Sequence, residues 1–182
     1  MRPTRPRSRE QLILSLAITL TQHPRASMGE LATLVGISRA TLARHFASRE
    51  GMEQAITDTA VAHASQALER AQPYTGTAYE ALRRLISELL PIAELYAYVG
   101  QQQLADEKID NQSMPLRNTL ITLFQTWQSS GQVRIDMSAA WLVESMAALL
   151  KSAAAMIRSG RLARLDAVDH IFGVLWAGMS KN

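Results

Sequence analysis

The sequence predicts an all-α protein of about nine helices, with short helices first and longer ones after them. Three observations lead to this prediction. Glycine and proline are sparse, with nine and six among 182 residues. Apolar residues recur at intervals of three and four, and the alternation typical of strands is absent. Serines stand where helices need capping residues.

The first three helices are expected to be short. A capping box at Ser8 begins the first, which ends near Pro24 because residues before proline avoid helical angles. A second capping box at Ser27 begins the next helix, and Gly36 ends it. Ser38 then caps a third helix that reaches residue 45.

Two longer helices are expected to follow. The fourth runs from Ser48 to Arg70, and the fifth covers residues 77–98 with a kink at Pro91. The polar stretch 101–113 is expected to be a loop with at most one short helix.

The sequence pattern after residue 113 predicts three more helices. An apolar stripe from Leu116 to Trp127 indicates one, and the last two are expected over 137–159 and 163–179. The former is apolar on almost every side, and such a helix is buried on every side. A chain this small cannot enclose it near its own end, so we expect a homodimer formed through the last two helices.

Composition excludes several classes of protein. Because there is no cysteine, a disulfide framework, a thiolate metal site and a cysteine nucleophile are excluded. No uncharged apolar run reaches the ~18 residues of a membrane span, since Glu144 and Lys151 interrupt the longest candidate. We therefore expect a soluble cytoplasmic protein without a membrane partner, a metal or a cofactor.

The charge is unevenly distributed. Residues 1–50 hold eight arginines and three glutamates, a net charge of +5, whereas residues 51–182 have a net charge of −2. A basic head on a slightly acidic body suggests that the head meets a polyanion, although an anionic membrane surface would suit the same asymmetry.

The stretch 27–52 has the spacing of a helix-turn-helix, a motif that places its second helix in the major groove of DNA. Ala32 is small enough for two helices to cross closely, while Leu42 and Phe46 share one face and anchor the second helix. Arg39 and Arg44 lie on other faces, where each could donate two hydrogen bonds to a guanine.

The residues from Leu31 to Met52 read L-A-x-x-V-G-I-S-x-x-T-L-x-x-H-F-x-S-R-E-x-M. This string resembles the DNA-binding signature of the TetR family of bacterial transcriptional regulators, I-A-x-x-A-G-V-S-x-G-T-L-Y-x-H-F-x-S-K-E-x-L. The resemblance implies a DNA-binding domain over residues 1–50. Its first seven residues are charged and interrupted by prolines, so we expect them to be disordered. The resemblance also implies a ligand-binding and dimerisation domain over 51–182.

The resemblance implies DNA contacts in the third helix and at the start of the fourth. The implied contacts are Ser38, Arg39, Ala40, Thr41, Ala43, Arg44, His45 and Arg49. Arg39 and Ala40 would lie nearest the base edges, and Thr41, His45 and Arg49 would contact phosphates. Ala43 departs from the family's tyrosine, and Gly29 replaces a longer and often basic residue, which leaves the second helix with little to offer DNA.

A regulator of this family is implied to bind a palindromic operator on double-stranded DNA and to respond to a small-molecule effector, with repression as the family default. Candidate pocket residues are His63, Tyr96, Phe124, Trp127, Glu144 and Met146. Each of them is equally compatible with ordinary core packing.

Two alternatives remain at this point. One is a small all-helical enzyme, or a ligand-binding protein without sequence-specific DNA binding. No paired metal ligands, glycine-rich phosphate loop or nucleophile elbow supports the enzyme. The other is a helical scaffold or membrane-surface protein, which lacks a strongly amphipathic basic helix.

Overall fold

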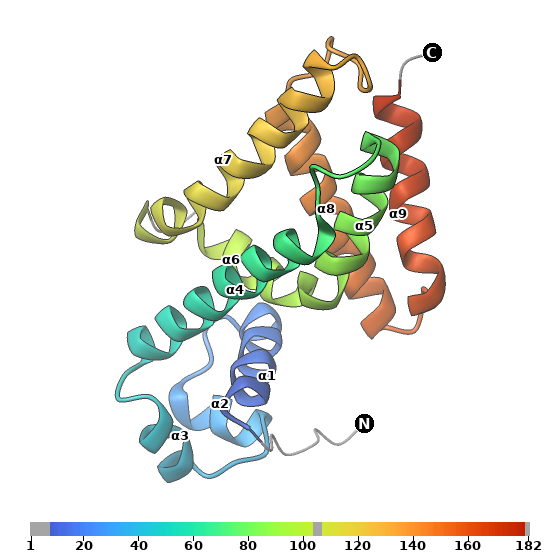
Figure 1. Cartoon of the computed structure of the whole chain (residues 1–182). Coiled ribbons are helices and arrows are strands. Elements are labelled where there is room, and N and C mark those ends of the chain that lie inside the picture. Colours follow the sequence, from blue (N-terminus) through green and yellow to red (C-terminus); the bar gives the residue numbers. More distant parts are fainter. Residues whose placement is uncertain (1–7, 104–106, 181–182) are drawn as a thin grey trace. The chain divides into compact units, whose positions relative to one another are not determined.

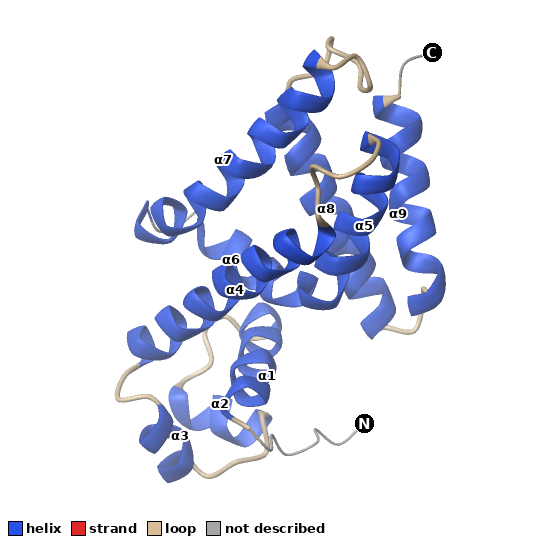
Figure 2. Cartoon of the chain, viewed as in Figure 1, coloured by secondary structure: helices blue, strands red, loops and turns tan. Residues whose placement is uncertain are grey.

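The computed structural model describes residues 8–103 and 107–180, and all regular secondary structure in those ranges is helical (Figure 2). The all-α prediction is confirmed, with nine α-helices and one 3₁₀ turn among these residues. In chain order they are α1 (Arg9–Gln22), α2 (Met28–Leu34), α3 (Arg39–His45), α4 (Arg49–Ala71), α5 (Ala78–Leu89), η1 (Leu90–Ile92), α6 (Ala93–Gln103), α7 (Glu107–Ser129), α8 (Ala139–Arg158) and α9 (Arg164–Met179). Residues 1–7, which are expected to be disordered, lie outside the described residues.

The described residues form two compact units. The first contains those up to Ala62 together with those of Glu94–Asp110, and the second contains His63–Ala93 and those from Asn111 onward. The first unit thus extends beyond residue 50, because part of α4 and most of α6 pack into it. The functional division into residues 1–50 and 51–182 stays a prediction.

The core of the first unit is built from α1 to α4 and α6. Leu16 of α1 and Ile56 of α4 have no exposed surface, and they share one apolar cluster with Leu42 of α3. From α6, Tyr98 and its neighbours enter the same cluster. A segment far along the sequence therefore completes the core beneath the helix-turn-helix.

The second unit is formed around three helices that lie side by side, with α9 packed against both α5 and α8 (Figure 1). Leu85 of α5, Phe124 of α7 and Met146 of α8 are at most 1% exposed. On the surface where α5 meets α9, Tyr79 makes edge-to-face contacts with the rings of Phe172 and Trp176 at 4.7 and 5.0 Å.

Two expectations are wrong. The single kinked helix over 77–98 is instead broken, because the 3₁₀ turn that contains Pro91 separates α5 from α6. Proline has no N–H for the helical ladder and its ring clashes with the preceding turn, so the axis changes there. The polar stretch 101–113 is not chiefly a loop: α6 continues to Gln103 and α7 begins at Glu107. Glutamate, lysine and glutamine are good helix formers, so a polar composition does not oppose a helix here.

Candidate nucleic-acid interface

Two short capped helices form the turn motif of the first unit. The Ser27 hydroxyl accepts a hydrogen bond from the Glu30 N–H at 3.3 Å, and the Glu30 carboxylate accepts one from the Ser27 N–H at 2.7 Å. These bonds, led by the one from the backbone, lower the pKa of Glu30. Gly36, at φ 75°, makes the turn that a residue with a side chain would resist. The Ile37 N–H then donates to the Ala32 carbonyl at 2.9 Å and holds the turn against α2.

Helix α3 has one buried face and one exposed face. Leu42 is 1% exposed and Phe46, at its end, is 4% exposed, so these two side chains seat the helix on the core. The exposed residues of this short helix are Arg39, Ala40, Ala43 and Arg44. The two alanines have short side chains and lie between two long, positively charged arginine side chains. A helix face of this shape can approach the edges of base pairs closely.

Ser38 and Thr41 form a small hydroxyl network at the start of α3. The Ser38 hydroxyl accepts a hydrogen bond from the Thr41 N–H at 3.0 Å, and the two side-chain oxygens are 2.8 Å apart. If Ser38 donates its own proton to Thr41, the Thr41 hydroxyl keeps its proton for an incoming acceptor. His45, in the last turn, is half-buried beside Phe46.

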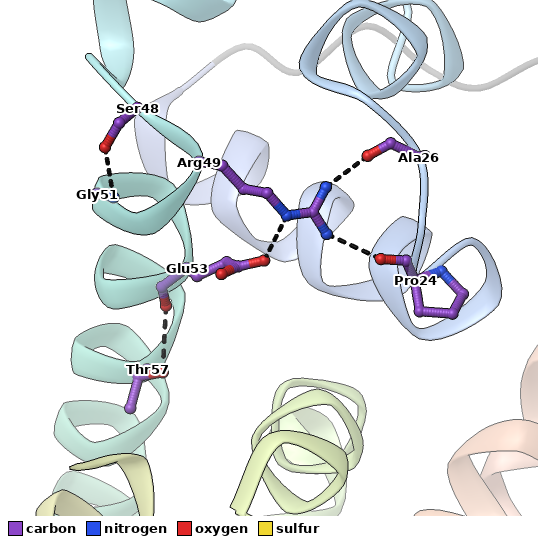
Figure 3. Close-up of polar contacts among 7 residues, drawn as sticks. All are labelled: Pro24, Ala26, Ser48, Arg49, Gly51, Glu53 and Thr57. Carbon is purple, nitrogen blue, oxygen red and sulfur yellow. Dashed lines mark hydrogen bonds and ion pairs between the residues drawn. The ribbon is translucent and has the colours of Figure 1, made fainter. Parts of the chain in front are cut away.

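Arg49, at the start of α4, contacts three separate points of the first unit (Figure 3). Its Nε donates to the Glu53 carboxylate at 2.8 Å, within the same helix. Its Nη1 donates to the Ala26 carbonyl at 2.5 Å and its Nη2 to the Pro24 carbonyl at 2.8 Å. Both carbonyls belong to the turn before α2, so this guanidinium ties the turn to α4. A guanidinium has five N–H donors, and two remain for another acceptor.

This role of Arg49 was not predicted from the sequence. The spacing of Arg49 and Glu53 is that of an i,i+4 helical ion pair and could have been noticed. Bonds to the carbonyls of Pro24 and Ala26 leave no such signal, because they depend on how α4 and the turn meet in space.

A hollow of about 720 Å³ was also not anticipated. It lies on the first unit, and its lining residues are His23, Pro24, Arg25, Ala26, Gly29, Glu30, Thr33 and Leu34. A side chain at Gly29 would meet only the Ser27 hydroxyl at 3.9 Å, so packing does not require glycine there.

None of the predicted pocket residues is among the residues that line this hollow, and the surroundings of those whose side chains are described differ from one another. Phe124 and Trp127 of α7 are buried with ring centroids 4.8 Å apart, and Met146 of α8 is 1% exposed. Glu144 is exposed on α8, where Arg117 forms an ion pair with it at 3.3 Å.

The remaining two pocket candidates are His63 and Tyr96. His63 is half-buried on α4. The side chain of Tyr96 lies outside the described residues. The structure thus brings three apolar candidates into the core of the second unit, and their role as a pocket lining stays a prediction. Within 8–103 and 107–180, no group of three or more His, Asp or Glu side chains is placed to hold a metal ion.

Comparison with known proteins supports the interpretation of this motif as a DNA-binding helix-turn-helix. No protein-family model matches the chain. The HTH-type transcriptional regulator NfxB of Pseudomonas aeruginosa is 31% identical over 159 residues, which cover 85% of this chain and 84% of NfxB. The HTH-type transcriptional repressor LfrR of Mycolicibacterium smegmatis is 29% identical over 107 residues, covering 58% of this chain and 57% of LfrR.

The fold is also that of a solved regulator. The crystal structure of the TetR-like transcriptional regulator LfrR in complex with proflavine matches with a TM-score of 0.70 at 23% identity, covering 94% of this chain and 96% of that one. Both named relatives are transcriptional regulators, so the enzyme alternative is not favoured.

Proposed function

The chain belongs to the TetR family of helix-turn-helix transcriptional regulators, and from this premise we propose that it is a homodimeric repressor of a palindromic operator, released by a small-molecule effector. The observation that carries the proposal is the exposed face of α3, in a pair of helices that are each capped at the N-terminus. A protein with this role works where the chromosome is, in the bacterial cytoplasm.

Base recognition falls to the exposed face of α3. Arg39 and Arg44 are exposed and can each donate two hydrogen bonds to the O6 and N7 of a guanine, which discriminates by about 1–3 kcal/mol per base pair. Ala40 and Ala43 allow the helix to approach the groove closely and can contact a thymine methyl group.

Phosphate contacts fall to the ends of α3 and to the start of α4. Thr41 has a hydroxyl proton to donate once Ser38 donates to its oxygen, and His45 lies one turn further along the same helix. Arg49 can offer its two remaining N–H donors while its other three hold the turn before α2. Its contribution to DNA binding is therefore expected to be largely one of positioning.

The homodimer is proposed to form through α8 and α9. By length and composition alone, α8 could cross a membrane, and only 33% of its apolar window is buried within the chain. Trp141 of α8 and Val174 of α9 are 64% and 62% exposed. Beside Val174, an added side chain at Gly173 or Gly178 would meet no atom within 4 Å, so a neighbouring helix can approach closely. A second copy paired through the same surface would cover these residues and match the twofold symmetry of a palindrome.

The effector site is proposed to lie in the second unit, near Phe124, Trp127 and Met146. Aromatic and methionine side chains suit a flat or apolar ligand. Because proflavine is bound in the solved structure of LfrR, it is a reasonable first compound to test. An effector acts only through its differential affinity for the operator-bound and free forms.

Selection from genomic fragments tests the DNA-binding part of this proposal. The purified protein should enrich a palindromic duplex whose half-sites are centred about 34–36 Å apart, one helical turn, with two subunits bound. With roughly 6–10 phosphate contacts, its affinity should fall about 10³–10⁵-fold between 50 and 200 mM salt. Failure to enrich any sequence, with weak binding that every duplex shares, would contradict a sequence-specific regulator.

A further inference from the structure

Arg9 stands in the first turn of α1, at a position that α1 itself does not favour. The N-terminal end of a helix carries a partial positive charge, which favours anionic side chains such as Glu10 and disfavours cations. Arg9 is exposed, so burial does not explain its presence either. Its guanidinium carbon lies over the ring of Phe46, 5.5 Å from the ring centroid. A cation at this distance from an aromatic face is attracted to it, and this contact gives Arg9 a partner outside α1.

The ring beneath Arg9 belongs to the residue at which α3 ends. Phe46 leaves the helical conformation, with φ −140° and ψ 115°, while its N–H still donates to the Leu42 carbonyl at 2.9 Å. The residue is 4% exposed and belongs to the apolar cluster of the first unit that also contains Leu12 and Ile13 of α1. The Arg9 guanidinium therefore adds a polar contact from α1 to the end of α3.

The two ends of α3 are held in different ways. At its start, the Ser38 hydroxyl accepts a hydrogen bond from the Thr41 N–H at 3.0 Å, a contact between near neighbours in the chain. At its last turn, which carries Arg44 and His45, the contacts of Phe46 with the core and with the cation above it hold the helix. A helix of seven residues has few hydrogen bonds of its own, so a contact at one end limits how far that end can move.

We propose that Arg9 is a positioning residue for base recognition, whose guanidinium holds the last turn of α3 through the Phe46 ring. Loss of this hold would let the end of α3 that carries Arg44 move more than the end that carries Arg39. The consequence for the operator rests on the proposed function, whereas the consequence for the mobility of α3 does not.

Two substitutions and their combination isolate the contact between the cation and the ring. Arg9→Met removes the charge and keeps a long unbranched side chain. Site-specific replacement of Phe46 by pentafluorophenylalanine keeps the shape of the ring and reverses the charge of its face, so the ring no longer attracts a cation. Thermal melts establish that each protein is folded. Should the fluorinated protein not fold, Phe46→Leu provides a second background without the ring.

Hydrogen–deuterium exchange in the DNA-free full chain measures the hold on α3. Peptides spanning residues 42–48 report on its last turn, because they include the Phe46 N–H. Peptides around Leu142 in the second unit serve as the internal reference. Arg83→Met is the matched control, because the Arg83 guanidinium lies over the ring of Phe172 in the second unit, 5.6 Å from its centroid. This control should leave exchange in α3 unchanged.

Arg9→Met should speed exchange in the last turn of α3 about threefold when Phe46 has its native ring, and should not speed it when the ring is fluorinated or absent. Equal acceleration in both backgrounds would mean that Arg9 acts on α3 by another route, and this result overturns the inference. Exchange that is unchanged or slower in the single variant overturns it as well.

The salt dependence of DNA binding separates positioning from a direct phosphate contact. On the duplex recovered by selection, Arg9→Met should weaken binding about threefold, again only with the native ring, and leave the slope of log affinity against log salt unchanged. It should also relax preference more at the base pair that Arg44 recognises than at the one that Arg39 recognises. Weaker binding in both backgrounds, with a slope reduced by about one, would make Arg9 a phosphate contact and overturn the inference.

The positioning role and the regulator proposal can fail separately. If no duplex is recovered but exchange shows the coupling between Arg9 and Phe46, the regulator proposal fails and the hold on α3 stands. If a duplex is bound but exchange shows no coupling, the positioning role fails and the regulator proposal stands.

Discussion

Arg49 Nη1 donates a hydrogen bond to the carbonyl oxygen of Ala26 at 2.5 Å, across 23 positions of sequence. This contact links the start of α4 to the turn that precedes α2, and the neighbouring carbonyl of Pro24 receives a second bond from the same guanidinium. The helix-turn-helix is thus held by a side chain at the start of α4 as well as by the caps of α2 and α3.

Replacing Arg49 should loosen the first unit. Arg49→Ala leaves the carbonyls of Ala26 and Pro24 without their donor, and we expect the free energy of unfolding to fall by about 1–2 kcal/mol, since the site is partly exposed. Urea denaturation measures this loss. Arg25→Ala, at a nearby exposed arginine, is the control and should change stability by less than about 0.5 kcal/mol. Equal effects of the two substitutions would show that the tether contributes nothing.

The arginines on the exposed face of α3 should matter for DNA and not for folding. Arg39→Ala and Arg44→Ala should each weaken binding to the selected duplex by about 1–3 kcal/mol and relax base preference at one position. Their melting temperatures should match that of the unmodified protein. Arg161→Ala, an exposed arginine of the second unit, controls for the loss of one charge. Sequence preference that survives both α3 substitutions would assign base recognition elsewhere.

A charge on the exposed face of α9 should separate the subunits. Val174→Glu places a carboxylate where a second copy is proposed to pack, and desolvating an unpaired charge is costly. Light scattering after size exclusion should then report a monomer for the variant and a dimer for the unmodified chain. Tyr74→Glu introduces the same charge in an exposed turn and should leave the dimer intact. Were both variants to remain dimeric, α9 would not lie at the interface.

Substitutions in the second unit can distinguish residues that line a ligand pocket from residues that only pack in the core. Phe124 has no exposed surface, so Phe124→Ala should cost about 3–5 kcal/mol of stability if the ring is fully packed. Glu144→Ala removes an exposed ion pair with Arg117 and should cost less than about 1 kcal/mol. Urea denaturation compares the two. A small loss at Phe124 would indicate that the ring borders unfilled space, as the lining of a ligand pocket would.

The capping box at α2 should respond to acid in a defined direction. Because the Ser27 N–H lowers the pKa of Glu30, the ionised carboxylate contributes stability above the ordinary pKa of about 4.3 and loses it as the pH falls through the lowered value. The stability advantage of the unmodified protein over Glu30→Gln should therefore be present at pH 7 and vanish in stronger acid.

Glu80→Gln, in the equivalent box of α5, should behave in the same way, because Thr77 lowers the pKa of Glu80. Thermal melts across the acid range measure both differences. An advantage that does not change with pH would exclude the charged cap as its source.

Features set by residues three or four apart could be predicted from the sequence. The caps at Ser27 and Ser38 and the turn at Gly36 are confirmed, because each depends on a backbone group within reach of its own neighbour in the chain. The exposed face of α3 follows from the same periodicity, since Leu42 and Phe46 fix which side is buried.

Features that depend on which distant segments meet could not be predicted in this way. The break at Pro91 was expected only as a kink, and nothing in the local pattern brings Tyr98 into the core beneath the helix-turn-helix. The bonds of Arg49 to the turn at Pro24 and Ala26 join segments that the sequence keeps apart. Local propensity acts over one helical turn, whereas burial and tethering are decided by the packing of whole helices, and only the tertiary structure contains that information.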